Sequence, residues 1–224
     1  LQGSLRDDGA MAMEGALPKA GGGVQRQRIV WTPKPDGSVG AVYRKMHLVP
    51  FGEVIPTGFR WFIDLMRIPL GDFNRGAVGQ PSFDWRGQRL APNICYEDLF
   101  GEELAARFTD TATAPTVLAN ISNIGWFGDS IAIDQHLNIS RMRALEFQRP
   151  FVRATNTGAT AIIDHEGNVT DQLPRKTEGV LNGEVQGRTG LTPYAWWVSR
   201  FGLWPLWIAA LTIVALALRT KPGK

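Results

Sequence analysis

The sequence contains little of what disulfide frameworks, metal centres and nucleotide sites require. Cysteine occurs once, as Cys95, which excludes an intrachain disulfide and a multi-cysteine metal site. The three histidines, His47, His136 and His165, lack the spacing of metal ligands. Phosphate-binding glycine motifs of the GxGxxG and GxxxxGK types do not occur. We therefore expect neither a metal nor another cofactor.

Charged residues are also sparse, at 20% of the chain, and the formal net charge is only +3. The sequence has no run rich in lysine and arginine and no aromatic–basic repeat, so we do not expect nucleic acid as a partner. Hydrophobic residues make up 44% of the 224 residues, which is the composition of a globular protein with a substantial core.

One long uncharged segment lies near the C-terminus. Phe201–Leu218 has no charged residue, and as a helix it would span about 27 Å, close to the roughly 30 Å hydrocarbon thickness of a bilayer. Tryptophans gather at its start, as they do at membrane interfaces: Trp196, Trp197, Trp204 and Trp207. We expect residues 196–224 to form one transmembrane helix with a basic tail. The alternative is a buried core helix.

The flanking charges predict how this segment is oriented. Arg219, Lys221 and Lys224 follow it, so the positive-inside rule places the C-terminus in the cytoplasm and residues 1–195 on the extracytoplasmic side. Leu1–Asp8 has neither the basic nor the apolar region of a signal peptide. An exported domain without such a signal leads us to expect that the chain is a fragment.

The only cysteine is a candidate nucleophile. Cys95 ends a short apolar stretch, and two carboxylates, Glu97 and Asp98, follow within three residues. The pattern is typical of a thiol at the end of a buried strand, although a lone cysteine is more commonly a small buried hydrophobe. Lys45 and Glu53 flank an apolar run that contains a proline. They are either solvated surface residues or charges held against the core, where each needs a partner.

Apolar and alternating patterns predict an α/β protein. Strands are expected over 28–31, 40–43, 116–120, 151–156 and 159–164, a helix over 131–149, a turn over 33–38 and a loop over 6–26. Asn120 and Asn156 each follow an apolar run, where strand-end residues face a site, but either residue alone is more typical of a structural loop position.

Several stretches of the chain together resemble one enzyme family. They are YRKMHLVPFGEVIP, NICYEDLFGEEL, NISNIGWFGDS, QHLNISRMRALEFQRPFVRATNTG and TPYAWW before the apolar segment. They are similar to apolipoprotein N-acyltransferase, a membrane-embedded member of the nitrilase superfamily. The resemblance extends from about Leu1 to the end of the chain. It implies a nitrilase-like αββα sandwich over residues 1–195, incomplete at its N-terminus, followed by the transmembrane helix of residues 196–224.

The resemblance also implies the residues of the site. The family has a Glu-Lys-Cys triad, in which Cys95 matches the nucleophile and Lys45 matches the lysine that stabilises the thiolate and the oxyanion. Glu53 matches the second essential glutamate. Tyr96 and Glu97 match the supporting positions after the cysteine.

The chain departs from the family pattern in two places. The general-base glutamate of the family lies in a Pro-Glu motif on an earlier strand. Glu14 is superficially similar, but it lies in a glycine-rich stretch where the family has a loop, so we reject it and expect the base to be absent. Ile124-Gly125 replaces the usual Asp-Ala, which affects the fine geometry of a loop.

The implied function is acyl transfer in lipoprotein maturation. The acyl chain passes from a phospholipid, phosphatidylethanolamine being the expected donor, to the N-terminal diacylglyceryl-cysteine amine of an apolipoprotein through a Cys95 thioester. The implied location is a bacterial inner (plasma) membrane, and we expect a monomer. Two alternatives stay open: a nitrilase-type amidase, and a degenerate fragment that lacks the triad glutamate and only binds.

Overall fold

The computed structural model describes residues 11–18, 24–34, 36, 38–59, 61, 65 and 73–219. The strands are β1 (Met11–Pro18), β2 (Val24–Pro33), β3 (Val39–Arg44), β4 (Phe83–Trp85), β5 (Gln88–Ile94), β6 (Val117–Ser122), β7 (Phe151–Thr155), β8 (Ala161–Ile163) and β9 (Val169–Gln172). The α-helices are α2 (Gly101–Ala105), α3 (Ala132–Phe147), α4 (Pro193–Phe201) and α5 (Trp204–Arg219). Short 3-10 helices are η1 (Cys95–Leu99), η2 (Ala106–Phe108) and η3 (Gly125–Phe127).

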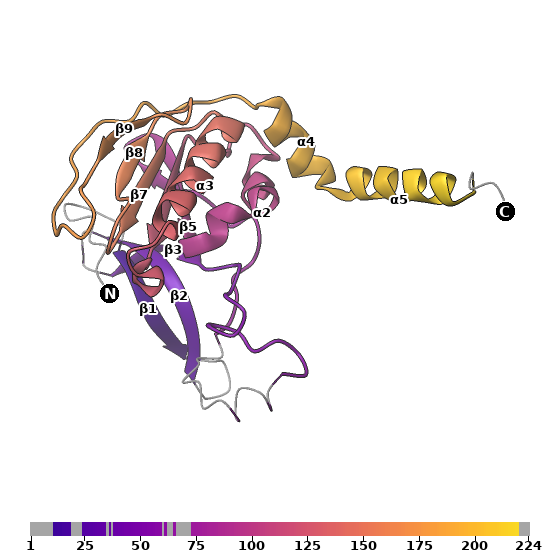
Figure 1. Cartoon of the computed structure of the whole chain (residues 1–224). Coiled ribbons are helices and arrows are strands. Elements are labelled where there is room, and N and C mark those ends of the chain that lie inside the picture. Colours follow the sequence, from indigo (N-terminus) through magenta and orange to yellow (C-terminus); the bar gives the residue numbers. More distant parts are fainter. Residues whose placement is uncertain are drawn as a thin grey trace.

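The strands form two neighbouring sheets (Figure 1). The first is antiparallel, with the order β1–β2–β3. The second has the order β4–β5–β6–β7–β8–β9, in which β5, β6 and β7 are parallel and the outer pairs are antiparallel. Parallel strands need a crossover, and α3 supplies the one between β6 and β7. The carboxyl ends of β5, β6 and β7 therefore meet at one edge of the sheet.

Most of the expected elements are present. The strands predicted in the first and second halves of the chain correspond to β2, β3, β6, β7 and β8, and the predicted helix corresponds to α3. The loop expected over 6–26 is wrong in part, because β1 and the start of β2 fall within it. Since β1 pairs with β2 along its whole length, ladder hydrogen bonds outweigh the weak strand propensity of its glycine and alanines.

The core joins α3 to the six-stranded sheet. Ile133, Ala144 and Phe147 on α3 pack with apolar residues of β6, β7 and β8, and all three are fully buried. A smaller cluster connects the two sheets at the point where β5 ends: Val30, Tyr43, Phe83 and Ile94. The molecule is therefore an α/β fold, as predicted, and the contact between its sheets lies directly before Cys95.

The C-terminal segment forms two helices instead of one. Thr192 caps α4, where its Oγ1 accepts a hydrogen bond of 3.0 Å from the backbone N–H of Ala195. Gly202, with a φ of 57°, ends α4, and α5 then leaves at a bend of 78°. Among the described helices, none alone has the length and hydropathy to cross a membrane, whereas the bent pair α4–α5 does by length and composition. A single transmembrane helix is thus not confirmed.

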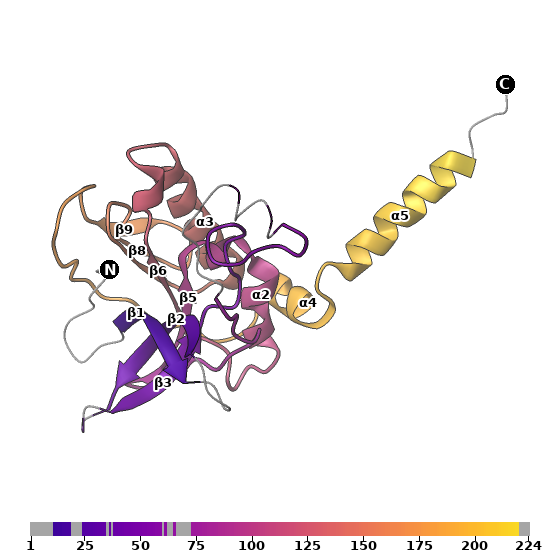
Figure 2. The ribbon, with the colours of Figure 1, turned by 90° about the horizontal axis from the view of Figure 1, so that it is seen from below.

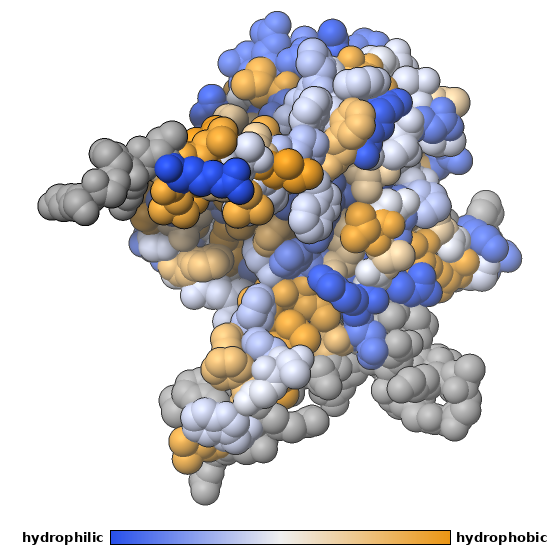
Figure 3. Space-filling model, turned by 90° about the vertical axis from the view of Figure 1, so that its right-hand side faces the viewer, coloured by the Kyte–Doolittle hydropathy of each residue, from blue (hydrophilic) through white to orange (hydrophobic). Residues whose placement is uncertain are grey.

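The two helices differ in their contacts. Ala195 and Val198 of α4 are buried in the core, so the domain boundary predicted after residue 195 falls inside a helix that packs on the body. No residue of α5 is buried, and this helix projects away from the body in Figures 1 and 2. Figure 3 shows orange, apolar side chains exposed on the side from which α5 projects.

We predict that the packing of Phe147 accounts for most of what the last turn of α3 contributes to the stability of the protein. Phe147 is fully buried and stacks on Phe108 with ring centroids 4.6 Å apart. Phe147→Ala should cost about 3–5 kcal/mol through lost contacts and the cavity left behind. The control is Leu145→Ala on the same helix, because Leu145 is 45% exposed. Thermal denaturation of both variants tests this, and equal losses of Tm would contradict it.

Candidate active site

Cys95 lies at the turn between β5 and η1. Its backbone φ is 58°, a left-handed conformation that is costly for a residue with a side chain and that persists only where the surroundings hold it. Asn120 of β6 contributes to this restraint, because its Nδ2 donates a 2.7 Å hydrogen bond to the Cys95 carbonyl oxygen. The thiol is partly buried. The thiol therefore lies on a sharp, fixed turn that directly follows the buried end of β5.

Lys45 follows directly after β3 and is only 1% exposed. Its Nζ lies 2.7 Å from Oε2 of Glu53, and Arg28 on β2 places its Nε 2.6 Å from Oε1 of the same carboxylate. The backbone N–H of Val49 also donates to Oε2, at 3.0 Å. Glu53 is therefore held by two cations and a peptide group. The interpretation of Lys45 and Glu53 as solvated surface residues is wrong.

The charges around Cys95 act on its thiol in opposite directions. Burial raises the pKa of Cys95, and the positive charge of Lys45 lowers it. The carboxylates of Glu53 and Asp98 raise the pKa of the thiol again. Among the described residues, no carboxylate makes a hydrogen bond to Cys95 Sγ. The thiol consequently stays protonated until a base removes the proton, and Lys45, followed by the backbone N–H of Tyr96, favours the thiolate.

Glu97 connects the nucleophile turn to the lysine loop. Its Oε1 accepts hydrogen bonds from the backbone N–H groups of Met46, at 2.5 Å, and His47, at 3.0 Å. Its Oε2 accepts from Tyr43 Oη at 2.8 Å and from the N–H of Ile94 at 2.6 Å. Burial raises the pKa of Glu97, although these hydrogen bonds oppose that rise. This carboxylate therefore ties the residues after Lys45 to the residue before Cys95.

Tyr96 supports the same loop from the other side. Its hydroxyl donates a 2.8 Å hydrogen bond to the carbonyl oxygen of Leu48, and its ring centroid lies 5.4 Å from Lys45 Nζ. Burial, followed by the charge of Glu53, raises the pKa of Tyr96 to about 12. The hydroxyl therefore remains a donor at neutral pH. Tyr96 thus shields Lys45 and fixes the chain that follows it.

Sequence reasoning named Asn120 but missed Asn93 and Arg153, with which it forms a row of polar side chains near the nucleophile turn. Asn93, Asn120 and Arg153 face one another in register across β5, β6 and β7, and all three are buried. Asn120 Nδ2 donates to Asn93 Oδ1 at 2.5 Å as well as to the Cys95 carbonyl. The position of Asn120 after an apolar run was the available signal. Asn156 instead orders a loop, where its Oδ1 accepts from the N–H of Ile124 at 3.0 Å.

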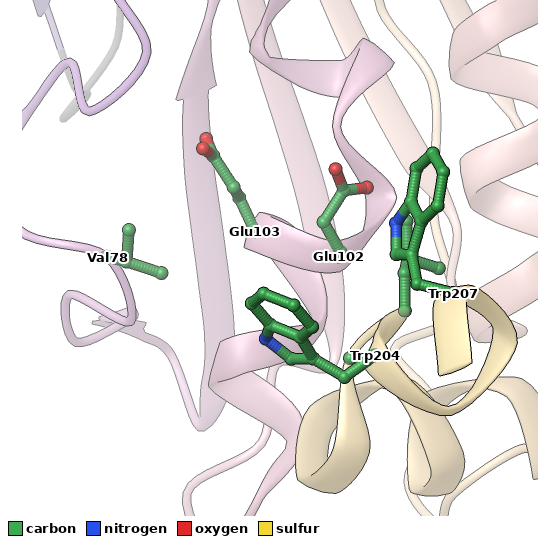
Figure 4. A pocket seen from close by; sticks show the side chains of 7 residues that line it. Val78, Glu102, Glu103, Trp204 and Trp207 are labelled. Carbon is green, nitrogen blue, oxygen red and sulfur yellow. The ribbon is translucent and has the colours of Figure 1, made fainter. Parts of the chain in front are cut away.

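A cleft of about 490 Å³ opens between α2 and the start of α5. Figure 4 shows Trp204 and Trp207 on one side of it and the carboxylates of Glu102 and Glu103 on the other. Glu103 Oε1 also contacts His47 Nδ1 at 3.0 Å. The cleft is thus connected to the loop that follows Lys45, but neither Lys45 nor Cys95 lines it. Among the described residues, no group of three or more acidic, histidine or cysteine side chains could hold a metal ion.

Comparison with known proteins identifies relatives over most of the chain. The carbon-nitrogen hydrolase family matches residues 12–194. Apolipoprotein N-acyltransferase from Verminephrobacter eiseniae is 70% identical over 168 residues, covering 72% of this chain and 31% of that protein. The enzyme of the same name from Ralstonia nicotianae is 55% identical over 183 residues, covering 81% of this chain and 34% of that protein. The chain therefore spans about a third of the length of these relatives.

Solved structures share the fold at low sequence identity. An amidase of the nitrilase superfamily from Nesterenkonia superposes with a TM-score of 0.54 at 19% identity, covering 88% of this chain and 67% of that one. A carbon-nitrogen hydrolase from Helicobacter pylori gives 0.53 at 18% identity, covering 76% and 60%. These likenesses support the nitrilase-type α/β sandwich and nothing finer.

We predict that Lys45→Met raises the pKa of the Cys95 thiol, because the substitution removes the charge that lowers it. The midpoint of the pH profile for iodoacetamide alkylation should move to higher pH. At pH 8 the rate should fall by about tenfold, which corresponds to a shift of about one unit. Lys176→Met is the control, since Lys176 is exposed and pairs with Asp129. A profile for Lys45→Met that matches the control would contradict the prediction.

Glu97→Gln tests the tie between the two sheets. The amide would keep one acceptor oxygen, and Tyr43 could turn to accept from the new NH2 group, which leaves the N–H of Ile94 without an acceptor. We expect a loss of about 1–3 kcal/mol in stability. Alkylation of Cys95 should also change. Glu166→Gln, at an exposed turn, should alter neither the Tm nor the alkylation rate; a Glu97→Gln variant equally silent would refute the assignment.

Proposed function

The chain belongs to the carbon-nitrogen hydrolase family, and from this premise we propose that it is the cysteine-bearing part of an apolipoprotein N-acyltransferase. The observation that carries the proposal is Cys95 on its left-handed turn beside the buried pair Lys45–Glu53. The 70% identity to a relative of that name supports the choice of reaction within the family.

In the first step of the proposed reaction, the Cys95 thiolate attacks the acyl ester carbonyl of a phospholipid. The sulfur–carbon bond forms, and the negative charge moves to the carbonyl oxygen, where Lys45 provides the stabilising positive charge. The carbon–oxygen bond to the glycerol then breaks. The alkoxide leaves as lysophospholipid after taking a proton, and the acyl chain remains on Cys95 as a thioester.

In the second step, the α-amino group of a diacylglyceryl-cysteine at the N-terminus of an apolipoprotein attacks the thioester carbonyl. An amide bond forms, the sulfur–carbon bond breaks, and the amine proton returns the enzyme to its starting state. The exchange of an ester for an amide is favourable, and the same lysine stabilises both tetrahedral intermediates. The reaction needs no metal or cofactor.

The proton of Cys95 requires a base. Glu53 is engaged by Lys45 and Arg28, so we assign it to orienting Lys45. Both carboxylate oxygens of Glu97 already accept two hydrogen bonds each, so we assign Glu97 to holding the turn and not to proton transfer. We therefore assign the base to the glutamate of the family's Pro-Glu motif, which we expect to be absent from residues 1–224. Glu14, rejected for this role, lies on β1, and its side chain is outside the described residues.

The proposed location follows from the substrates and from α4–α5. Both proposed substrates carry acyl chains, and the exposed apolar surface of α5, with Trp204 and Trp207 at its start, suits an inner-membrane environment. The bent pair would then cross or enter the bilayer, with the catalytic residues on the extracytoplasmic side and the basic tail in the cytoplasm. The proposed partners are a phospholipid donor, phosphatidylethanolamine being the expected one, and an apolipoprotein acceptor, and the protein is proposed to act as a monomer.

The decisive experiment is intact-mass spectrometry of the intact protein in detergent after incubation with phosphatidylethanolamine. In a longer protein that also supplies the triad glutamate, we expect a mass increase of one acyl chain that maps to Cys95, is lost with hydroxylamine and is absent in Cys95→Ala. Residues 1–224 alone should acylate about 10²–10⁴-fold more slowly, because we expect the base to be absent from them. Lys45→Met should reduce the adduct strongly, whereas Lys176→Met should not.

The other readings give different results in the same experiment. An adduct with amide substrates but not with phospholipid would replace the proposal with an amidase, the activity named for the Nesterenkonia structure. No adduct with either class would support a degenerate binding module and overturn the proposal.

A further inference from the structure

Four buried polar side chains form a cluster beside the nucleophile turn. Asp98 comes from η1, His136 and Ser140 from one face of α3, and Arg153 from the middle of β7. The side chains of Asp98, Ser140 and Arg153 have essentially no exposed surface. None of these residues contributes to the pairing of Lys45 with Glu53. Asp98, which lies three residues after Cys95, joins this cluster to the nucleophile turn.

The hydrogen bonds in this cluster determine the tautomer of His136. Arg153 can only donate, so its contact of 2.6 Å to His136 Nδ1 makes that nitrogen the acceptor. The proton of the neutral ring then lies on Nε2, which donates to Asp98 Oδ1 at 3.0 Å. Ser140 Oγ donates to Asp98 Oδ2 at 2.6 Å and accepts from Arg153 at 2.7 Å. His136 and Ser140 thus each bridge the guanidinium of Arg153 and the carboxylate of Asp98 through hydrogen bonds.

The two charges of the cluster depend on each other. Arg153 NH1 lies 3.3 Å from Asp98 Oδ2, and removal of one charge would leave the other buried without compensation. Both charges also act on the thiol: the carboxylate of Asp98 raises the pKa of Cys95, and a Cys95 thiolate interacts favourably with Arg153. The cluster is therefore electrostatically coupled to the nucleophile as well as covalently adjacent to it.

The nucleophile turn is held on two sides. Glu97 points toward the residues after β3, whereas the next residue, Asp98, points toward α3 and β7. Between them, Asn120 restrains the Cys95 carbonyl. A left-handed φ at Cys95 is stable only if the residues on both sides are fixed. Asp98 supplies the attachment on the side that Glu97 does not reach.

We propose that Asp98 is a positioning residue for the nucleophile: through His136, Ser140 and Arg153 it fixes the turn after Cys95 so that the thiol stays beside Lys45. This role rests on the proposed function only in that Cys95 is taken as the nucleophile. It does not depend on which acyl donor or acceptor is used.

The test compares Asp98→Asn with a matched control in the intact protein. Arg149→Lys is that control, because Arg149 is equally buried and donates to the backbone carbonyls of Pro115 and Gly190, each at 2.6 Å. It precedes β7, at the opposite edge of the parallel strands from Cys95. Two readouts are taken at matched loss of Tm: the pH profile of Cys95 alkylation by iodoacetamide, and kcat and KM for acyl transfer from phosphatidylethanolamine.

For Asp98→Asn we expect both the alkylation midpoint and kcat to fall, so that easier formation of the thiolate is accompanied by slower acyl transfer. The charged groups that face Cys95 are Lys45, Glu53, Asp98 and Arg153, so loss of the Asp98 charge should move the alkylation midpoint to lower pH. The thiolate then forms more easily, yet kcat for acyl transfer should fall by about 10²-fold because the sulfur is displaced, with KM little changed. Arg149→Lys should leave both quantities at wild-type values.

A double variant keeps the test valid if Asp98→Asn does not fold. Asp98→Asn/Arg153→Met removes both buried charges, an exchange that proteins commonly tolerate. The alkylation midpoint should return toward the wild-type value, while kcat stays low because the attachment is gone. Wild-type kcat in the double variant, or an Asp98→Asn variant indistinguishable from Arg149→Lys, would overturn the proposal. If the wild-type protein itself transfers no acyl chain, the proposed function fails. An Asp98→Asn variant with the alkylation profile of Arg149→Lys would then still overturn the role of Asp98.

Discussion

The carboxylate of Glu97 is the constraint on which the arrangement of the site depends. A carboxylate without solvent is stable only when its oxygens are fully hydrogen-bonded, and this one takes its donors from β3, from the loop after it and from the end of β5. Because these segments belong to different sheets, the hydrogen bonds fix the position of one sheet relative to the other. Lys45 comes from the first sheet and Cys95 from the second, so their proximity follows from the position of Glu97.

Buried carboxylates pair with cations on two sides of the thiol. Lys45 and Arg28 share Glu53 on one side, and Arg153 is paired with Asp98 on the other. Burial raises the pKa of the cysteine thiol, which favours the protonated thiol at rest. Such an arrangement suits a nucleophile that must be activated only when a base and a carbonyl are both present. It also explains why several buried charges are tolerated in so small a region.

The C-terminal helices relate this polar site to an apolar environment. The first, α4, is anchored in the core by Ala195 and Val198, so the direction in which α5 leaves is set by the folded body. Trp204 and Trp207, at the start of α5, line the cleft with Glu102 and Glu103 of α2, which itself follows the nucleophile turn. The first turn of α5 therefore lies across the cleft from α2, which begins six residues after Cys95 (Figure 4).

Local sequence patterns predicted the features that depend on neighbouring residues. Periodicity placed α3 and most strands, and the apolar approach to Cys95 placed the thiol at a strand end, because hydrophobic pattern and turn chemistry act over a few residues. The motifs also indicated Lys45, Glu53 and Glu97 as site residues. The way in which these charges are neutralised depends on the packing of segments that are distant in sequence. The partners of Asp98 lie 38 to 55 residues farther along the chain, and those of Glu97 on the Lys45 loop lie 50 and 51 residues before it. A buried charge is stable only with the partner that packing brings to it, and no local pattern specifies that partner.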